Sequence, residues 1–220
     1  MRRADVVVGT SRSMLEDLAW RDGLAAEKLR LVPNYVLAGD GAGAQARARE
    51  HGLLLYAGQL SRRKRVDLLI DATAMLARSG RRVMLEIRGE GPERASLERR
   101  AQDAGAPVWF GARIPHRELL DRMRSCWTYV QASSLEGHPK TLLEAMSVGT
   151  AVVASEAPGV SDCEGVERDR TAVLAPPDAG SMAGAIARVL DDAAFAAALG
   201  ERARACVRER CSLDAVTELE

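Results

Sequence analysis

The chain has 220 residues, of which 47% are apolar and 28% charged, an ordinary composition for a globular protein. Aromatic residues make up only 4%, so the core must come from Leu, Val, Ile and Ala, which suits a parallel sheet covered by helices. The 31 basic and 31 acidic residues give a formal net charge of zero, which argues against overall electrostatic binding of nucleic acid.

The four cysteines form neither a Cys-x-x-Cys pair nor a zinc-binding spacing, and the three histidines are scattered. No Asp-x-Asp occurs. We therefore expect free thiols in a reducing compartment, no bound metal and no cofactor. No apolar run is long enough to span a membrane or to form the core of a signal peptide, so the expected location is the cytoplasm.

Apolar runs of strand length recur along the chain. They are Val6–Val8, Leu29–Val32, Leu53–Ala57, Val83–Ile87, Val108–Phe110, Tyr129–Ala132, Ala151–Ala154 and Ala172–Leu174. Most are continuous rather than alternating, as expected for strands buried on both faces.

Helix signals separate these runs. They are a capping box from Ser13 to Glu16, helical apolar spacing from Val66, first-turn prolines at Pro92 and Pro139, an N-cap at Asp178, and a final helix from about Asp192 to Arg210. Strands alternating with helices predict an α/β fold, a Rossmann-like parallel sheet with helices on both faces. In such sheets ligands bind outside the carboxyl ends of the strands.

Composition also predicts the domain boundaries. Residues 36–50 are rich in Gly and Ala, which indicates a linker. Residues 51–210 form the expected main domain, and 211–220 a C-terminal tail. Residues 1–35 carry two strands and one helix, too little for a core of their own. They either pack on the main domain or are the end of a second domain that is largely absent.

Two loops after predicted strands contain glycines that suit close approach to a ligand. The loop Gly58–Lys64 ends in a lysine that can reach a phosphate as a point charge. A surface turn with basic side chains is an equally good interpretation. The loop Gly89–Pro92 predicts a tight turn between a strand and a helix and is only suggestive of a nucleotide.

The strongest signal is the loop and helix that follow the strand Tyr129–Ala132. A helix beginning at Pro139 would aim its free amides at the carboxyl edge of the sheet, with Lys140 beside them, and form an anion site. Glu136 would lie ahead of the helix and Glu144 inside it, where carboxylates can accept hydrogen bonds from sugar hydroxyls. Alternatively, Glu136 stabilises the helix dipole and Glu144 is solvated.

These residues resemble a known family. The segment E-G-H-P-K-T-L-L-E-A-M-S-V-G-T-A-V-V-A-S is similar to the E-x7-E segment of the retaining GT-B glycosyltransferases of family 4, also called glycosyl transferases group 1. Further similar segments follow the family's order: Y-A-G-Q-L-S-R-R-K, I-R-G-E-G-P, F-G-A-R-I-P-H-R-E-L and T-A-V-L-A-P-P-D. Upstream, A-D-V-V-V-G-T-S and L-R-L-V-P-N-Y-V resemble the end of an N-terminal domain. The resemblance covers nearly the whole chain and implies the C-terminal half of a GT-B fold, with residues 1–35 a remnant of the acceptor domain.

The resemblance implies a role for each matching residue. Glu136 would be catalytic, beside the reacting carbon and hydroxyls of the donor sugar, and Glu144 would bind the ribose. The diphosphate would be bound by Gly58, Gln59, Lys64, Lys140, Thr141 and Leu142. Arg113 and Ile114 would contact the base, and Gly89 would form a nearby turn. No metal is implied.

The implied reaction is nucleotide-sugar-dependent transfer of a hexosyl unit, with retention, to a sugar, a small molecule or a lipid-linked acceptor. A lipid-linked acceptor would place the protein at the inner face of the membrane. Three departures bear on this. Gln59 stands where the family usually has an arginine, for which Arg62 or Arg63 could substitute; Arg65 replaces a glycine; and the acceptor domain is almost wholly missing. Two hypotheses follow: an enzyme completed by a separate N-terminal domain chain or a longer protein, or a truncated or degenerate module that binds a nucleotide sugar without transferring it.

Overall fold

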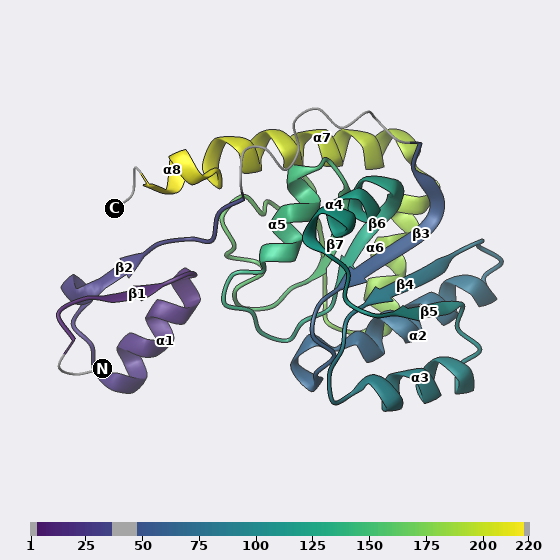
Figure 1. Ribbon diagram of the computed structural model, residues 1–220, viewed down its shortest axis with the longest axis horizontal. Helices are drawn as coiled ribbons and strands as arrows, with labels where there is room; N and C mark the ends of the chain where they lie inside the picture. The colour runs from purple at the N-terminus through teal and green to yellow at the C-terminus, as the bar shows by residue number, and fades with distance from the viewer. Residues whose placement is uncertain (1–3, 37–47, 218–220) are drawn as a thin grey trace.

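A six-stranded sheet forms the body of the molecule (Figure 1). The computed structural model describes residues 4–36 and 48–217. The sheet contains β3 (Glu50–Ala57), β4 (Met84–Arg88), β5 (Val108–Gly111), β6 (Cys126–Gln131), β7 (Ala151–Ser155) and β8 (Val173–Ala175). Every neighbouring pair is parallel. The predicted α/β class is confirmed.

The strand order places a crevice between β3 and β6. The order is β5-β4-β3-β6-β7-β8, so the chain runs from β3 toward one edge and then returns to the other side of β3. The carboxyl ends of β3 and β6 therefore lie at the point where the connections diverge, and doubly wound sheets bind ligands there.

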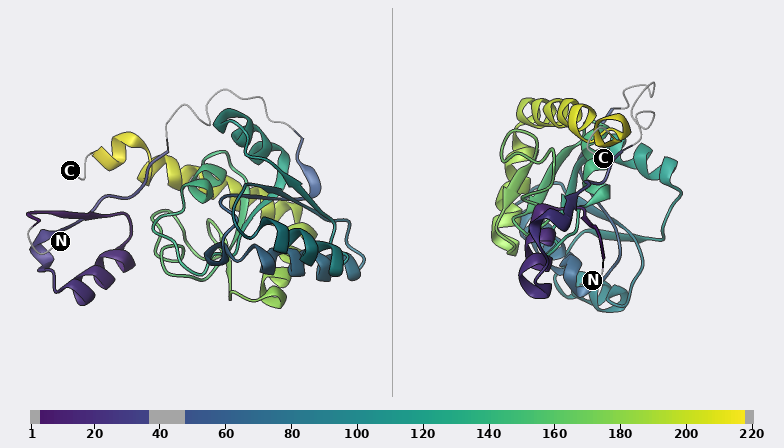
Figure 2. Two further views of the ribbon diagram at one scale, coloured as in Figure 1. Left: turned by 60° about the horizontal axis from the view of Figure 1, so that its bottom comes forward. Right: turned by 90° about the vertical axis from the view of Figure 1, so that its left-hand side faces the viewer.

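Helices cover both faces of the sheet (Figure 2). One face packs on α2 (Val66–Arg78), α3 (Arg94–Asp103) and α6 (Ala179–Asp191), and the other on α4 (His116–Ser125) and α5 (Lys140–Ser147). The helix α7 (Ala193–Arg210) contributes to both cores. Burial on both faces explains the continuous apolar strands. In the described part of the chain, no helix is long and apolar enough to cross a lipid bilayer.

The first described residues form a small separate unit (Figure 1). It contains β1 (Val7–Gly9), α1 (Arg12–Asp22), the 3-10 turn η1 (Ala26–Lys28) and β2 (Leu29–Leu31), and β1 pairs with β2 in parallel. The final helix α8 (Leu213–Thr217) follows α7 back toward this unit. The Val36 amide donates to the Cys211 carbonyl at 2.9 Å, which fixes the chain where it leaves the unit.

All eight predicted strands are present, with ends shifted by a few residues. The predicted capping box at Ser13 is wrong. Ser11 is the N-cap of α1 and accepts from the Met14 amide at 3.3 Å, while the Ser13 amide donates to Asp162. Asp178 caps α6 as predicted.

Both prolines predicted in a first helical turn lie just before their helices. Pro139 is the N-cap of α5, and Pro92 precedes α3, which starts at Arg94. The missing amide of proline suits these flanking positions as well as the first turn. Most of the predicted linker, residues 37–47, lies outside the described residues.

Candidate functional site

Two loops meet at the carboxyl ends of β3 and β6. Lys64 ends the 3-10 turn η2 (Arg62–Lys64) after β3, and Glu136 lies in the loop after β6. Although 72 residues separate them, the Lys64 Nζ atom is 2.5 Å from Glu136 Oε1. The Ser134 amide donates to the Arg63 carbonyl at 2.9 Å and joins the two backbones. The strand order therefore brings together two of the loops that the sequence analysis singled out.

The Glu136 carboxylate is buried and, within residues 4–36 and 48–217, accepts hydrogen bonds from four side chains. Only 6% of this side chain is exposed. Besides Lys64, the donors to Oε1 are Ser133 Oγ at 2.5 Å and Gln131 Nε2 at 3.3 Å. Arg63 Nη1 donates to Oε2 at 3.3 Å. A buried carboxylate needs such donors because desolvation penalises its charge. Gln131 and Ser133 were not predicted as site residues. They lie two positions apart at the end of β6, a spacing that places both side chains on one face of the strand, and this was the sequence signal that could have identified them.

The loop after β7 fixes the backbone of Glu136. The Glu136 amide donates to the Pro158 carbonyl at 2.9 Å. Gly159 has φ +76, and a Cβ atom there would lie 1.8 Å from the Glu136 carbonyl oxygen. Only glycine fits this contact, because a side chain would both strain the backbone and displace Glu136.

Glu144 is buried inside α5, so the interpretation that it is solvated is wrong. Its Oε1 lies 3.1 Å from Nε2 of His116, the first residue of α4. Arg113 is exposed and Ile114 half-buried, and both lie just before α4. The segment predicted to contact the base is thus held next to the residue predicted to bind the ribose. Sequence reasoning assigned no role to His116.

The amino end of α5 opens on the same edge of the sheet. Its N-cap, Pro139, supplies no capping side chain, and its carbonyl accepts from the Leu142 amide at 3.1 Å. Among the described residues, the amides of Lys140 and Thr141 have no backbone acceptor. The exposed Lys140 side chain lies beside them. Two free amides and a cation form an anion-binding arrangement. The Leu142 amide does not contribute to it, because that amide donates to the Pro139 carbonyl.

The loops after β3 and β4 pack directly against each other. The Gly58 amide donates to the Arg88 carbonyl at 3.0 Å, and a Cβ atom on Gly89 would lie 1.9 Å from the Gly58 carbonyl oxygen. Gly89 therefore allows the close approach that positions the β3 loop. Gln59 is exposed, and its carbonyl accepts from the Tyr56 hydroxyl at 3.0 Å.

Arg65, which replaces the glycine usual in the family, has a left-handed conformation with φ 47. A non-glycine residue pays about 1–2 kcal/mol for this conformation. Its guanidinium pairs with Asp67 in the first turn of α2 at 3.0 Å. The loop thus keeps the backbone geometry that a glycine would adopt.

His138, two residues after Glu136, contacts the segment that follows β2. Its carbonyl accepts from Asn34 Nδ2 at 2.7 Å. Its ring is buried, with Nε2 3.4 Å from Cys163 Sγ and no hydrogen-bond partner for Nδ1 among the described residues. Burial lowers the pKa of His138 to about 4, with the negative charge of Asp162 acting in the opposite direction.

Comparison with known proteins identifies the family to which this fold and site belong. Residues 42–205 match the family model described as glycosyl transferases group 1. The chain belongs to this family. The resemblance to the GT-B glycosyltransferases of family 4 is thereby confirmed.

Several known proteins resemble the chain along nearly its whole length. Glycogen synthase of Mycobacterium tuberculosis is 31% identical over 218 residues, which cover 97% of this chain and 51% of that protein. Sucrose-phosphate synthase of Thermosynechococcus elongatus superposes with a TM-score of 0.82 at 28% identity, over 99% of this chain and 57% of that one. Anabaena HepE in complex with UDP-glucose gives a TM-score of 0.87 at 20% identity, over 99% of this chain and 63% of that one, a likeness of fold. The chain spans about half the length of the curated relatives it matches.

Proposed function

We propose that this chain binds a nucleoside diphosphate sugar and provides the donor half of a retaining hexosyltransferase. The observation that carries the proposal is the convergence of Lys64 and Glu136 at the crevice between β3 and β6. The free amides of α5 and the side chain of Lys140 open on the same edge. A diphosphate needs these cationic and amide donors, and a sugar needs the carboxylate.

The proposed chemistry uses these groups at the leaving group and at the sugar. When the bond between the anomeric carbon and the diphosphate breaks, its electron pair passes to the diphosphate. Lys64, Lys140 and the Thr141 amide stabilise the charge that develops there, which is commonly the largest catalytic contribution. The sugar passes through an oxocarbenium-like state, and the carboxylate of Glu136 stabilises its positive charge. An acceptor hydroxyl then bonds to the anomeric carbon, and its proton leaves with the diphosphate.

Glu144 binds the ribose in this proposal. A ribose hydroxyl takes the place of the His116 nitrogen, 3.1 Å from Oε1 of Glu144, and donates to the carboxylate. Arg113 and Ile114, on the segment before α4, contact the base. Gly58 and Gln59 face the diphosphate from the β3 loop, opposite the amino end of α5.

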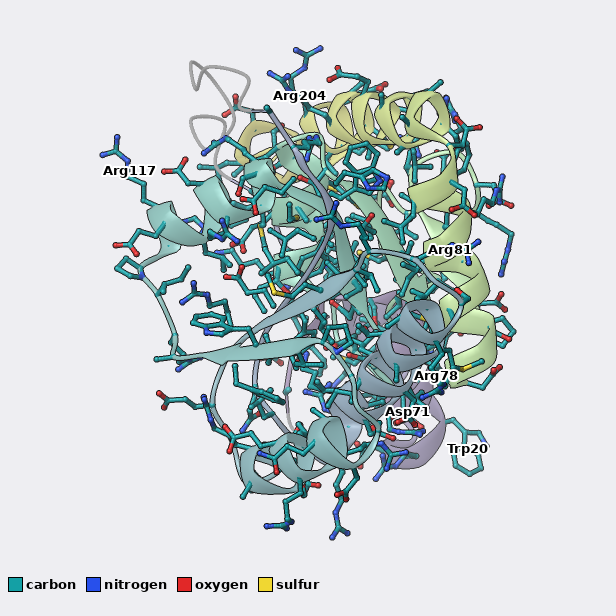
Figure 3. All side chains as sticks on the ribbon, turned by 90° about the vertical axis from the view of Figure 1, so that its right-hand side faces the viewer. Trp20, Asp71, Arg78, Arg81, Arg117 and Arg204 are labelled. Atoms are coloured by element: carbon teal, nitrogen blue, oxygen red, sulfur yellow. The ribbon has the colours of Figure 1, made fainter. Side chains whose placement is uncertain are left out.

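We further propose that residues 1–35 belong to a second, acceptor-binding domain, joined by the linker 36–50 to a donor domain of residues 51–210 with a tail at 211–220. The apolar residues Val6 and Val8 are exposed on the two-stranded sheet. Trp20 is 85% exposed and projects from the molecule (Figure 3). Parallel strands are normally covered on both faces, so this unit requires a further layer. The rest of a longer polypeptide, or a separate chain, would supply it and the acceptor site.

A module that binds a nucleotide sugar without transferring it is the second candidate function. The observation that favours it is the exposed Gln59, which contributes no charge to the β3 loop. In both candidates the acceptor side of the cleft comes from residues beyond 51–210. The purified 220-residue chain is therefore expected to bind donor nucleotide and to transfer no sugar.

Two measurements on the purified chain test these proposals. Calorimetric titration with UDP, GDP and ADP tests donor binding, and absence of heat with all three would remove both candidates. Release of nucleoside diphosphate from UDP-glucose, GDP-mannose and ADP-glucose is then followed with simple sugar acceptors. Turnover by this chain alone would overturn the proposed need for a further domain.

A further inference from the structure

The two oxygens of the Glu136 carboxylate accept different numbers of hydrogen bonds. Oε1 accepts from Lys64, Ser133 and Gln131, whereas among the described residues only Arg63 donates to Oε2. The Arg63 contact is 3.3 Å, which is long for a hydrogen bond to a carboxylate. The Arg63 side chain is 46% exposed and that of Lys64 only 18%. Oε2 is therefore the oxygen that can exchange its partner.

The backbone of Arg63 is fixed while its side chain has room to move. Its carbonyl accepts from the Ser134 amide at 2.9 Å and from the Ser134 hydroxyl at 3.2 Å. Its Nη1 also donates to the Leu135 carbonyl at 2.7 Å. The guanidinium therefore stays beside the Glu136 loop whichever partner it takes.

We propose that Arg63 exchanges partners when the donor binds. A sugar hydroxyl takes Oε2 of Glu136, and the released guanidinium pairs with the diphosphate. This inference rests on the proposed function and adds a binding residue to it. Charge compensation is kept at each stage, because the Lys64 ammonium has three donors and keeps one on the buried carboxylate while it faces the diphosphate. A guanidinium matches phosphate oxygens in a fork.

The neighbouring Arg62 has a different environment. Its side chain is 93% exposed, and its Nε lies 3.6 Å from a Glu93 carboxylate oxygen, away from Glu136. The structure therefore assigns the exchange to Arg63 and not to Arg62. Since both arginines belong to η2, Arg62 is a matched control for the loss of one positive charge in this loop.

The first test compares nucleotide affinities of variants of the 220-residue chain. Whichever of UDP-glucose, GDP-mannose and ADP-glucose binds the unmodified chain most tightly serves as the probe, because the sugar supplies the hydroxyl that releases Arg63. Arg63→Gln is expected to bind it about tenfold more weakly, the effect of losing one charge-assisted hydrogen bond. Arg62→Gln is expected to stay within about twofold. Arg63→Lys, which keeps the positive charge but loses the fork of donors, is expected to bind the probe more weakly than the unmodified chain and more tightly than Arg63→Gln.

The second test measures whether Glu136 restrains Arg63. Glu136→Gln removes the negative charge that holds the guanidinium, so it should tighten binding of the sugar-free nucleotide. Glu136→Gln also releases Lys64, but it does so both in the unmodified chain and in Arg63→Gln. The effect of Lys64 on nucleotide affinity therefore cancels in a double-mutant cycle. Glu136→Gln is expected to increase nucleotide affinity by a factor at least about three times larger in the unmodified chain than in Arg63→Gln.

The outcomes separate this inference from the proposed function. Equal affinities of Arg63→Gln and Arg62→Gln, or equal tightening in both backgrounds, would overturn the exchange and leave donor binding intact. If Arg63→Gln lacks a cooperative thermal transition, Arg63→Lys decides, and an affinity of that folded variant equal to that of the unmodified chain overturns the exchange. Failure of the unmodified chain to bind any of the three nucleotide sugars or their nucleoside diphosphates would overturn both proposals.

Discussion

Replacing Lys64 by methionine removes the ammonium group from a buried carboxylate. The pair is close, at 2.5 Å, and the side chains are 18% and 6% exposed. Removing one partner of a fully buried pair costs about 3–5 kcal/mol, because the remaining charge is left without compensation. Here Ser133, Gln131 and Arg63 still donate to Glu136. We therefore expect Lys64→Met to lower the free energy of unfolding by about 2 kcal/mol.

A double-mutant cycle isolates the pair from the loss of the lysine side chain itself. Glu136→Gln removes the charge that needs compensation, so Lys64→Met should cost less than about 1 kcal/mol in that background. Urea unfolding followed by circular dichroism provides the assay. With a slope of about 2 kcal/mol per molar urea, the single variant should lower the midpoint by about 1 M.

The matched control is an exposed ion pair of the same protein. Arg81 pairs with Asp191 at 2.7 Å, but the side chains are 35% and 56% exposed. Arg81→Met should therefore change the free energy of unfolding by less than about 1 kcal/mol. A Lys64→Met midpoint no lower than that of Arg81→Met, or a coupling energy between Lys64 and Glu136 below about 0.5 kcal/mol, would show that Lys64 does not compensate a buried charge.

Three further predictions concern ribose binding, the loop that supports Glu136, and pH. Glu144→Ala should weaken nucleoside diphosphate binding about tenfold, since one charge-assisted hydrogen bond is lost. The variant should also lose the preference of the unmodified chain for the ribonucleotide over the 2′-deoxyribonucleotide. A preference that survives would show that Glu144 is structural. Gly159→Ala should lower the free energy of unfolding, measured in urea, by about 2–3 kcal/mol. Gly184→Ala, on α6 with open space around it, should raise that free energy by about 0.5–1 kcal/mol. Equal changes for the two variants would contradict the close contact between Gly159 and Glu136. Burial lowers the pKa of His138 to about 4, so only the unfolded chain protonates this imidazole as the pH falls from about 6.5 to 4. The free energy of unfolding should therefore fall by up to about 3 kcal/mol over this range. Urea unfolding at pH 7 and pH 4.5 should show a smaller fall for His138→Phe than for the unmodified chain.

The sequence was sufficient for the class of fold because its strongest pattern is local. Continuous apolar runs between helix signals predict parallel strands buried on both faces, and each run is a strand. The order of those strands depends on contacts between distant residues and has no local signal. The meeting of Lys64 with Glu136 depends on β6 lying beside β3, so it could be expected only from the family resemblance.

Partners of the predicted site residues were the part that sequence reasoning missed. Gln131 and Ser133 are ordinary polar residues at the end of a strand, and only the buried position of Glu136 gives them a role. The sequence predicts Ser13 as the N-cap of α1 because Glu16 follows it three residues later, as a capping box requires. In the structure the Ser13 amide donates to Asp162, and Ser11 caps the helix instead. Such choices depend on the tertiary structure.

Ligand-dependent melting tests the central claim, donor binding at the crevice between β3 and β6, most directly. The 220-residue chain is heated alone and with UDP, GDP or ADP. At a hundredfold excess over the dissociation constant, binding adds about 2.7 kcal/mol of stability, which raises the melting temperature of a chain of this size by about 5–10 °C. This rise is expected with at least one nucleotide, and Lys64→Met is expected to abolish it. An unchanged melting temperature with all three, for a chain that melts cooperatively, would contradict donor binding at this crevice.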